Sequence, residues 1–185
     1  MPGAAQTRRQ SLFGRFVRRN DGATAVEFGV VALPFFWLMT ALGEIAVMSM
    51  AQTNLNLAMA EMGRMVRTGQ VQLTGMSQAE VEDEVCNSLR DVMPLECDDR
   101  LYIDIETFDA FSDVNIDPPI NNGEFDDDEL TFDPGTPNDI VLVRGYYRWE
   151  VITPFFASIF SNVGSGDRLL TSAFAFRNEP WPVEP

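Results

Sequence analysis

Residues 20–52 read NDGATAVEFGVVALPFFWLMTALGEIAVMSMAQ, and this stretch decides how the chain is organised. No charged residue occurs from Phe28 to Gly43, and the apolar character continues to Met50. As a helix, residues 23–50 would extend about 42 Å, which exceeds the roughly 30 Å hydrocarbon core of a bilayer. We therefore expect a transmembrane helix over residues 23–50.

Charge is distributed unevenly around this span. The formal net charge is −15, yet five of the 13 basic residues precede Gly22, with Asp21 as the only acid there. Basic residues beside a membrane span tend to stay cytoplasmic. The sequence therefore predicts a single-pass protein with a cytoplasmic N-terminus and a translocated acidic body, residues 51–185.

The composition argues against several classes of function. Every basic residue is arginine and histidine is absent, so the commonest general acid/base and metal ligand is missing. An acidic body is a poor partner for nucleic acid, which is bound through its phosphates. The carboxylates could in principle form a hydrolytic pair, but nothing in the sequence brings two of them to a defined separation. We expect neither an enzyme nor a nucleic-acid-binding protein.

Glu27 and Glu44 interrupt the apolar character at its two ends. An ionised side chain near the bilayer centre is costly, so each should be interfacial or paired. If the chain is cut after Gly22, the new amine of Ala23 could pair with Glu27 of its own or a neighbouring subunit. The alternative is a glutamate at headgroup depth with no special role. Glu44 lies about 25 Å further along the helix, at the opposite interface or against a partner.

These residues carry a resemblance to a known family. Gly22 followed by ATAVEF (residues 23–28) and a long apolar helix resembles a type IV prepilin processing site, with glycine before the cut and glutamate fifth after it. More narrowly, DGATAVEFGVVALPFF resembles the TadE-like minor pilins (pseudopilins) of tight-adherence, or Flp-type, pilus systems. The late Glu44 and the segment LLTSAFAFRNEP, residues 169–180, fit the same pattern. The resemblance covers residues 20–68 and 168–180.

The resemblance implies a processing event and a structural role. A prepilin peptidase would remove residues 1–22 at the cytoplasmic face of a bacterial inner membrane, cutting between Gly22 and Ala23. The mature protein would be a structural subunit in pilus assembly, with its body in the periplasm or in the pilus. Its partners would be other pilins and the assembly machinery. The predicted contact residues are Glu27, Phe28 and Glu44.

The body begins with helices. The first helix should continue through Thr68 and end at Gly69. Its apolar residues in this part are spaced as on one helical face: Leu55, Met59, Met62 and Val66. A second helix should start at Ser77, where SQAE fits a capping box, and end before Pro94, with its buried face at Val81, Val85 and Leu89. Cys86 and Cys97 should form a structural disulfide, because neither belongs to a CxxC motif and a translocated body is an oxidising context.

Three segments alternate as half-buried strands: residues 101–108, 140–153 and 168–177. Antiparallel pairing would place one face of the sheet on the helices and leave the other in water. Residues 154–161 should add one or two helical turns. The predicted fold class is α+β, with a long transmembrane helix that continues into an amphipathic helix and packs with a small antiparallel sheet, as in pilins.

Residues 109–139 contain ten acids and no basic residue, which predicts a solvated acidic loop. Five residues nevertheless match the ligand spacing of an EF-hand: Asp113, Asn115, Asp117, Asn121 and Glu124. Pro118 stands where such a loop needs glycine, and its fixed φ opposes the sharp turn. We expect no cofactor. The alternative function is a membrane-anchored, extracytoplasmic calcium- or ligand-binding module.

Overall fold

The computed structural model describes residues 22–153, 156–164 and 166–182, so residues 1–21 of the predicted leader lie outside the described residues. The chain divides into two compact units, residues 1–42 and 43–185. It is an α+β protein with one long N-terminal apolar helix and a small antiparallel sheet. The predicted fold class is confirmed at this level.

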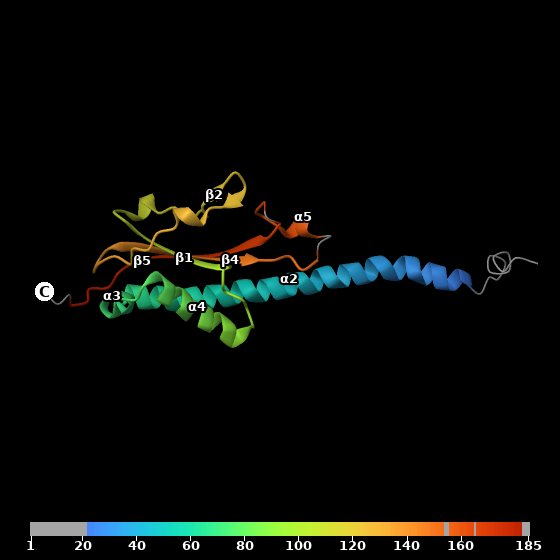
Figure 1. Ribbon diagram of the computed structural model, residues 1–185, viewed down its shortest axis with the longest axis horizontal. Helices are drawn as coiled ribbons and strands as arrows, with labels where there is room; N and C mark the ends of the chain where they lie inside the picture. Colours follow the sequence, from blue (N-terminus) through green and yellow to red (C-terminus); the bar gives the residue numbers. More distant parts are fainter. Residues whose placement is uncertain (1–21, 154–155, 165, 183–185) are drawn as a thin grey trace, which may run out of the picture. The chain divides into compact units, whose positions relative to one another are not determined.

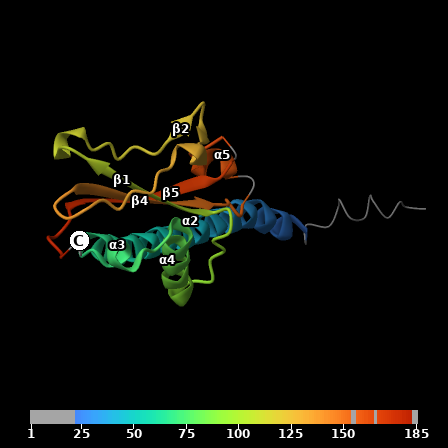
Figure 2. The ribbon, with the colours of Figure 1, turned by 60° about the vertical axis from the view of Figure 1, so that its left-hand side comes forward.

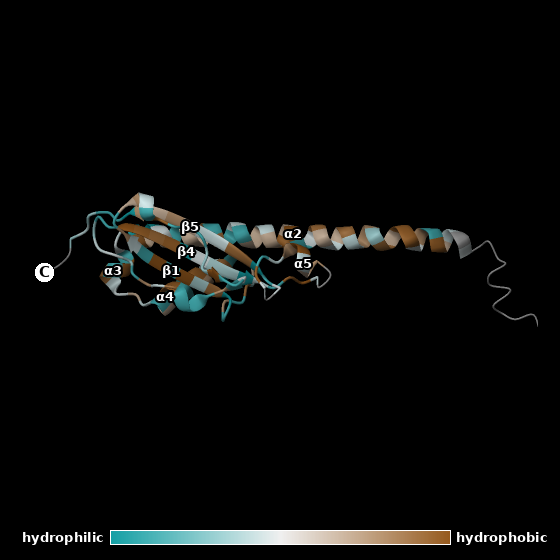
Figure 3. Cartoon of the chain, turned by 90° about the horizontal axis from the view of Figure 1, so that it is seen from above, coloured by the Kyte–Doolittle hydropathy of each residue, from teal (hydrophilic) through white to brown (hydrophobic). Residues whose placement is uncertain are grey.

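Helix α2 (Ala23–Arg67) is a single helix of 45 residues that runs through Pro34. In the first unit, residues 24–31 are all exposed, so apolar side chains point to every side of the helix. Figure 3 shows hydrophobic residues along this part of α2. The helix is long and apolar enough to cross a membrane, by length and composition. A helix that is apolar all round is suited to lipid or to the interior of an assembly.

In the second unit, α2 packs one face into the main hydrophobic core. Each residue predicted for this face is at most 2% exposed: Leu55, Met59, Met62 and Val66. The helix ends at Arg67, and Gly69 follows with a left-handed φ of 79°. The ring of Trp181 lies against Gly69 where a Cβ would stand, so glycine is required here for both conformation and space. The predicted end of the helix is confirmed.

Two shorter helices follow, α3 (Gln70–Thr74) and α4 (Gln78–Val92). Ser77 caps α4 through a complete capping box with Glu80, as predicted. The pKa of Glu80 is lowered because its carboxylate accepts hydrogen bonds from the backbone and side chain of Ser77. The buried face of α4 is the predicted one, with Cys86 beside it: Val81, Val85 and Leu89.

The main sheet has three antiparallel strands in the order β1-β4-β5: Leu101–Phe108, Ile140–Trp149 and Arg168–Arg177. Its inner face packs on the helices, and Figures 1 and 2 show α2, α3 and α4 on one side of it. The alternating residues predicted for this face join the same core as the helices, including Ile103, Val143 and Leu170. β4 ends at Trp149, four residues before its predicted end. The residue after it, Glu150, is exposed.

The prediction of a wet outer face holds only in part. Along β5 four outward residues are exposed: Thr171, Ala173, Ala175 and Arg177. The part of this face around Tyr146 is covered. Residues 109–139 lie over it, in the layer labelled β2 in Figures 1 and 2. A second, smaller cluster forms there around the 1% exposed Tyr146, with Leu169 and Val163 buried and Phe125 and Leu130 packed against them. Tyr146 contacts Phe125 with ring centroids 5.1 Å apart.

The acidic segment also has regular structure, which the prediction of a loop missed. Strands β2 (Ile120–Asn121) and β3 (Glu124–Phe125) form a hairpin through Asn122 and Gly123, both at positive φ. Two 3₁₀ turns flank it, η2 (Phe111–Asp113) and η3 (Asp127–Glu129). Further along, residues 131–133 pair with the edge of β1, where Ile105 donates to Thr131 and accepts from Asp133.

The predicted helical turn over residues 154–161 corresponds to α5 (Ala157–Phe160). Residues 154 and 155 lie outside the described residues. Phe156 and Phe160 stack with centroids 5.6 Å apart, and Ile159 is exposed.

Candidate functional site

The residues predicted for processing and assembly stand at the start of α2. The helix begins at Ala23, directly after Gly22. Glu27 and Phe28 follow one helical turn later, and both are exposed. The Glu27 carboxylate has no hydrogen-bond or ion-pair partner within the described residues. This end of the helix therefore presents a carboxylate and an aromatic ring, neither engaged by the part of the chain that the structure describes.

Gly22 has no conformational or steric reason to be glycine within the described structure. A Cβ at this position would meet nothing within 4 Å, and its φ is not in the left-handed region. Gly29 is alike in both respects. Any requirement for glycine at position 22 would thus come from something that acts on the chain rather than from the described fold.

Glu44 lies in a different setting from Glu27. It is 6% exposed, and its carboxylate accepts hydrogen bonds from two backbone amides of its own chain. The Ile152 amide nitrogen is 2.6 Å from Oε1, and the Thr153 amide nitrogen is 3.2 Å from Oε2. Backbone amides satisfy a carboxylate well because charge-assisted hydrogen bonds are strong. The carboxylate of Glu44 thus has partners within its own chain, and its predicted contact with a partner subunit stays a prediction.

The three predicted contact residues are divided between the two units. Glu27 and Phe28 belong to the first unit, and Glu44 belongs to the second. Sequence reasoning missed Ile152 and Thr153 as the partners of Glu44, because only their backbone amides take part and no side-chain pattern signals this.

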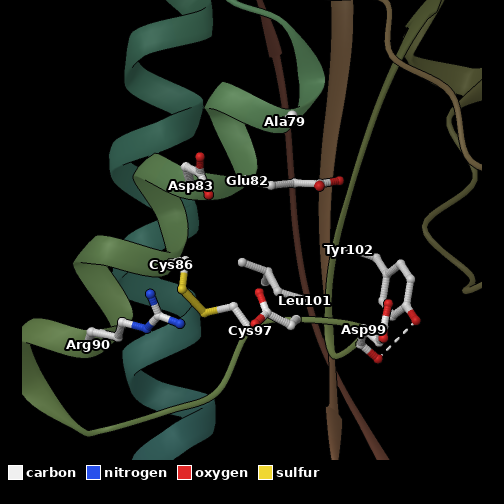
Figure 4. Close-up of a pocket in the computed structure, with 10 residues that line it drawn as sticks. Ala79, Glu82, Asp83, Cys86, Arg90, Cys97, Asp99, Leu101 and Tyr102 are labelled. Atoms are coloured by element: carbon white, nitrogen blue, oxygen red, sulfur yellow. Dashed lines mark hydrogen bonds between the residues drawn. A yellow bond between two sulfur atoms is a disulfide. The ribbon is translucent and has the colours of Figure 1, made fainter.

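Cys86 and Cys97 form the predicted disulfide, with Cα atoms 6.0 Å apart. It ties α4 to the segment that leads into β1 and borders a hollow of about 340 Å³, drawn in Figure 4. Within the hollow's lining, Tyr102 donates a hydrogen bond to the carbonyl of Asp99. The lining contains one arginine, Arg90, and four acids: Glu82, Asp83, Asp98 and Asp99. The Arg90 guanidinium donates to the Leu95 carbonyl.

The residues predicted for a calcium site form separate hydrogen bonds with other groups of the acidic segment. Asn115 accepts a hydrogen bond from the Asp117 amide, and Asn121 donates to Asp126 and Glu129. Asp113 accepts from the hydroxyl of its neighbour Ser112. Among the described residues, no group of three or more His, Cys, Asp or Glu side chains is arranged to hold a metal ion. The EF-hand spacing of the sequence does not become a ligand cluster in this structure.

Three further pKa shifts have local causes in or beside the main sheet. Burial raises the pKa of Tyr146 to about 12, and burial also raises the pKa of Tyr147. A hydrogen bond to Glu150 raises the pKa of Arg100. No ligand is needed to explain any of these shifts.

The carboxylate of Asp104 is buried, although it lies in one of the predicted half-buried strands. It lies in a network with Arg144 and Thr131, beneath the acidic segment. Asp104 and Arg144 are paired by the register of β1 on β4, which the alternation within each strand does not give.

Comparison of the chain with protein-family models, with curated proteins and with solved structures finds no match.

Proposed function

We propose that this chain is a minor pilin, or pseudopilin, of the tight-adherence type. It is a structural subunit that a prepilin peptidase shortens and that packs its transmembrane helix against partner pilins. Residues 1–22 would lie on the cytoplasmic side of a bacterial inner membrane until cleavage. The body would lie in the periplasm or in the pilus.

The observation that carries the proposal is the coincidence of the processing motif with the first residue of α2. The motif inferred from sequence separates Gly22 from Ala23, and the 45-residue helix begins at Ala23. A cut there would leave the helix whole and put a new positive charge at its N-terminus. The same helix is apolar on every side at first and then joins the core of an α+β body. Such a subunit can sit in a membrane and later in a helical assembly without refolding.

Gly22 supports the same proposal by elimination. The described fold places nothing near its missing Cβ, so a side chain there would cost the folded body nothing. A peptidase that must reach the backbone closely is a sufficient reason for glycine.

Glu27 and Phe28 supply the partner contact in this proposal. A carboxylate at this depth is costly unless it is paired, and no described residue pairs with it. The amine released at Ala23 of a neighbouring subunit, or of the same one, is a partner of suitable charge. Phe28, 71% exposed, adds apolar area beside it.

The decisive measurement is the N-terminus of the membrane-extracted protein. We expect mass spectrometry to find Ala23 as the first residue in cells that contain a prepilin peptidase, and Met1 in cells that lack it. An intact N-terminus in both strains would refute the proposal.

Two variant pairs separate cleavage from assembly. Gly22→Leu should block cleavage, whereas Gly29→Leu should not, although a Cβ is equally unhindered at both glycines. Glu27→Ala should be cleaved but recovered with partner pilins in much lower yield. Its control is Glu61→Ala, which changes an exposed glutamate of the same helix that pairs with Arg64. Normal recovery of the Glu27 variant would remove the assembly role of Glu27.

A further inference from the structure

We propose that Ile152 and Ile159 form a second membrane contact, in which both side chains lie in the outer interface of the bilayer that α2 crosses. The inference rests on the proposed membrane span. It goes beyond it by assigning the body its own lipid-facing surface, separate from the transmembrane helix.

The first support is the attachment of this surface to α2. Glu44 accepts hydrogen bonds from the amides of Ile152 and Thr153, the shorter at 2.6 Å. All three residues belong to the second unit. The backbone that follows β4 is thereby held beside one particular turn of α2. Ile152 cannot move far from the level of Glu44 without breaking these bonds.

The second support is a separate attachment beyond α5. Asn162 exchanges two hydrogen bonds with the backbone of Leu169, at 2.7 and 3.2 Å. The Arg168 guanidinium donates to the Phe160 carbonyl, the last residue of α5. Ile159 thus belongs to a short helix whose C-terminal end is fixed to β5.

The exposure of the two side chains is the feature that needs an explanation. Ile152 is 68% exposed and Ile159 is 66% exposed, although their backbones are fixed by neighbouring polar contacts. The turns of α2 beside Glu44 also expose apolar residues, including Ile45, Val47 and Met50. The apolar character of the span therefore continues on the body at this end of the second unit.

The position of Glu44 in the span selects the bilayer as the occupant. Glu44 is the first charged residue after the uncharged run from Phe28 to Gly43, so it marks the outer end of the hydrocarbon-spanning segment. A hydrocarbon core of roughly 30 Å takes about 20 helical residues, which places Glu44 near the outer interface when the span begins near Ala23. Ile152 is held at this level by Glu44. Ile159 belongs to the helix attached to Arg168, which pairs with Trp149, three residues before Ile152. Large apolar side chains favour this region of a membrane.

A body with two membrane contacts has restricted tilt. If the transmembrane helix were the only membrane contact, the body could rotate about the helix axis. A second contact fixes which side of the body faces the lipid. The sheet and the acidic segment would then be presented to partners in one orientation.

The test measures where each side chain lies. The full chain is reconstituted in phosphatidylcholine nanodiscs at one copy per disc, with single cysteines introduced at Ile152, Ile159, Leu38 or Ile116 and carrying a nitroxide. The native cysteines are paired and stay unlabelled. Collision of each nitroxide with oxygen and with a water-soluble nickel chelate is compared. Ile116 is the matched control, because it is an isoleucine of the acidic segment with 64% exposure.

We expect the labels at 152 and 159 to collide preferentially with oxygen and the label at 38 to show the same preference more strongly. The label at 116 should collide preferentially with the nickel chelate. If 152 and 159 behave like 116 while 38 reports hydrocarbon, the inference is wrong and the span stands. If 38 is also aqueous, the span itself is refuted. The labels at 152 and 159 could instead be accessible to nickel in discs that hold this protein alone and become shielded from it when partner pilins are added. That result would replace the lipid contact by a protein contact.

Discussion

Asp104 and Arg144 face each other across β1 and β4, and the Arg144 Nε lies 2.6 Å from the Asp104 Oδ2. The side chain of Asp104 is 1% exposed and that of Arg144 is 13% exposed. The second oxygen of Asp104 accepts hydrogen bonds from the amide and hydroxyl of Thr131. Arg144 also donates to the Asn115 carbonyl. The pair thus joins the sheet to two points of the acidic segment.

Removing one member of this pair should be strongly destabilising. Asp104→Ala leaves Arg144 with Glu106, 3.0 Å away, as its remaining carboxylate partner. We therefore expect a loss at the lower end of the about 3–5 kcal/mol that is typical when a buried pair is broken. We expect the free energy of unfolding to fall by about that amount in urea titrations of the detergent-solubilised protein. We also expect residues 109–139 to become sensitive to protease.

The control is Asp83→Asn, which removes an exposed acid of α4 and should change the free energy of unfolding by less than about 0.5 kcal/mol. If Asp104→Ala were as mild as this control, the pair would not hold the acidic segment to the sheet.

Much of the second unit could be predicted because its patterns are local. The end of α2 follows from Gly69, the start of α4 from the Ser77 capping box, and the three main strands from alternation. The cover on the outer face could not be predicted in the same way. It depends on a few isolated apolar residues, such as Phe125 and Leu130, within a segment whose acids indicate solvation.

The same limit applies to the candidate site. The motif at Gly22 and Glu27 is contiguous and can be read from the sequence, whereas the contact of Glu44 joins positions 108 residues apart through backbone amides. A long-range contact of this kind leaves no trace in spacing or charge. Only the folded chain distinguishes Glu44 from Glu27.

Tyr146→Phe should be neutral or stabilising. The Tyr146 hydroxyl is buried without a hydrogen-bond partner in the described structure, so its removal relieves a desolvated polar group. Tyr147→Phe is the matched control, because the Tyr147 hydroxyl donates to the Glu96 carbonyl at 2.8 Å. We expect this control to lose about 1 kcal/mol at neutral pH. A loss from Tyr146→Phe equal to that of the control would show that the Tyr146 hydroxyl has a partner after all.

The same residue predicts a pH dependence. The pKa of Tyr146 rises to about 12 in the folded protein, against roughly 10 in an unfolded chain. The folded state therefore holds this proton more tightly than the unfolded chain does. Ionisation of Tyr146 leaves the free energy of unfolding unchanged below a pH of about 10 and lowers it as the pH rises towards 12. Denaturation followed across this range should be shallower in Tyr146→Phe than in the wild type. An unchanged profile would contradict the assignment of this dependence to Tyr146.

Gly145 should not tolerate a side chain while Met59 faces it. A Cβ at Gly145 would lie 2.8 Å from the Met59 Cγ, and Met59 is fully buried. We expect Gly145→Ala to cost about 1–3 kcal/mol by overpacking. Combined with Met59→Ala, the loss should be smaller than the sum of the two single losses, because the contact is shared. Gly43→Ala is the control, since a Cβ there meets nothing within 4 Å. Strict additivity would show that the two positions do not press on each other.

Glu44→Ala should release the backbone that follows β4 and leave the assembly contact proposed for Glu27 unchanged. The variant removes the acceptor of the Ile152 and Thr153 amides, and hydrogen bonds to charged groups contribute about 1.5–3 kcal/mol. We expect hydrogen exchange at these two amides to accelerate by at least about tenfold, which corresponds to about 1.4 kcal/mol. Glu44→Gln keeps one oxygen acceptor and should give an intermediate rate, whereas Glu27→Ala should give the wild-type rate. Equal exchange in Glu44→Ala and Glu27→Ala would mean that Glu44 does not hold this segment, and the membrane contact inferred for Ile152 would lose its anchor.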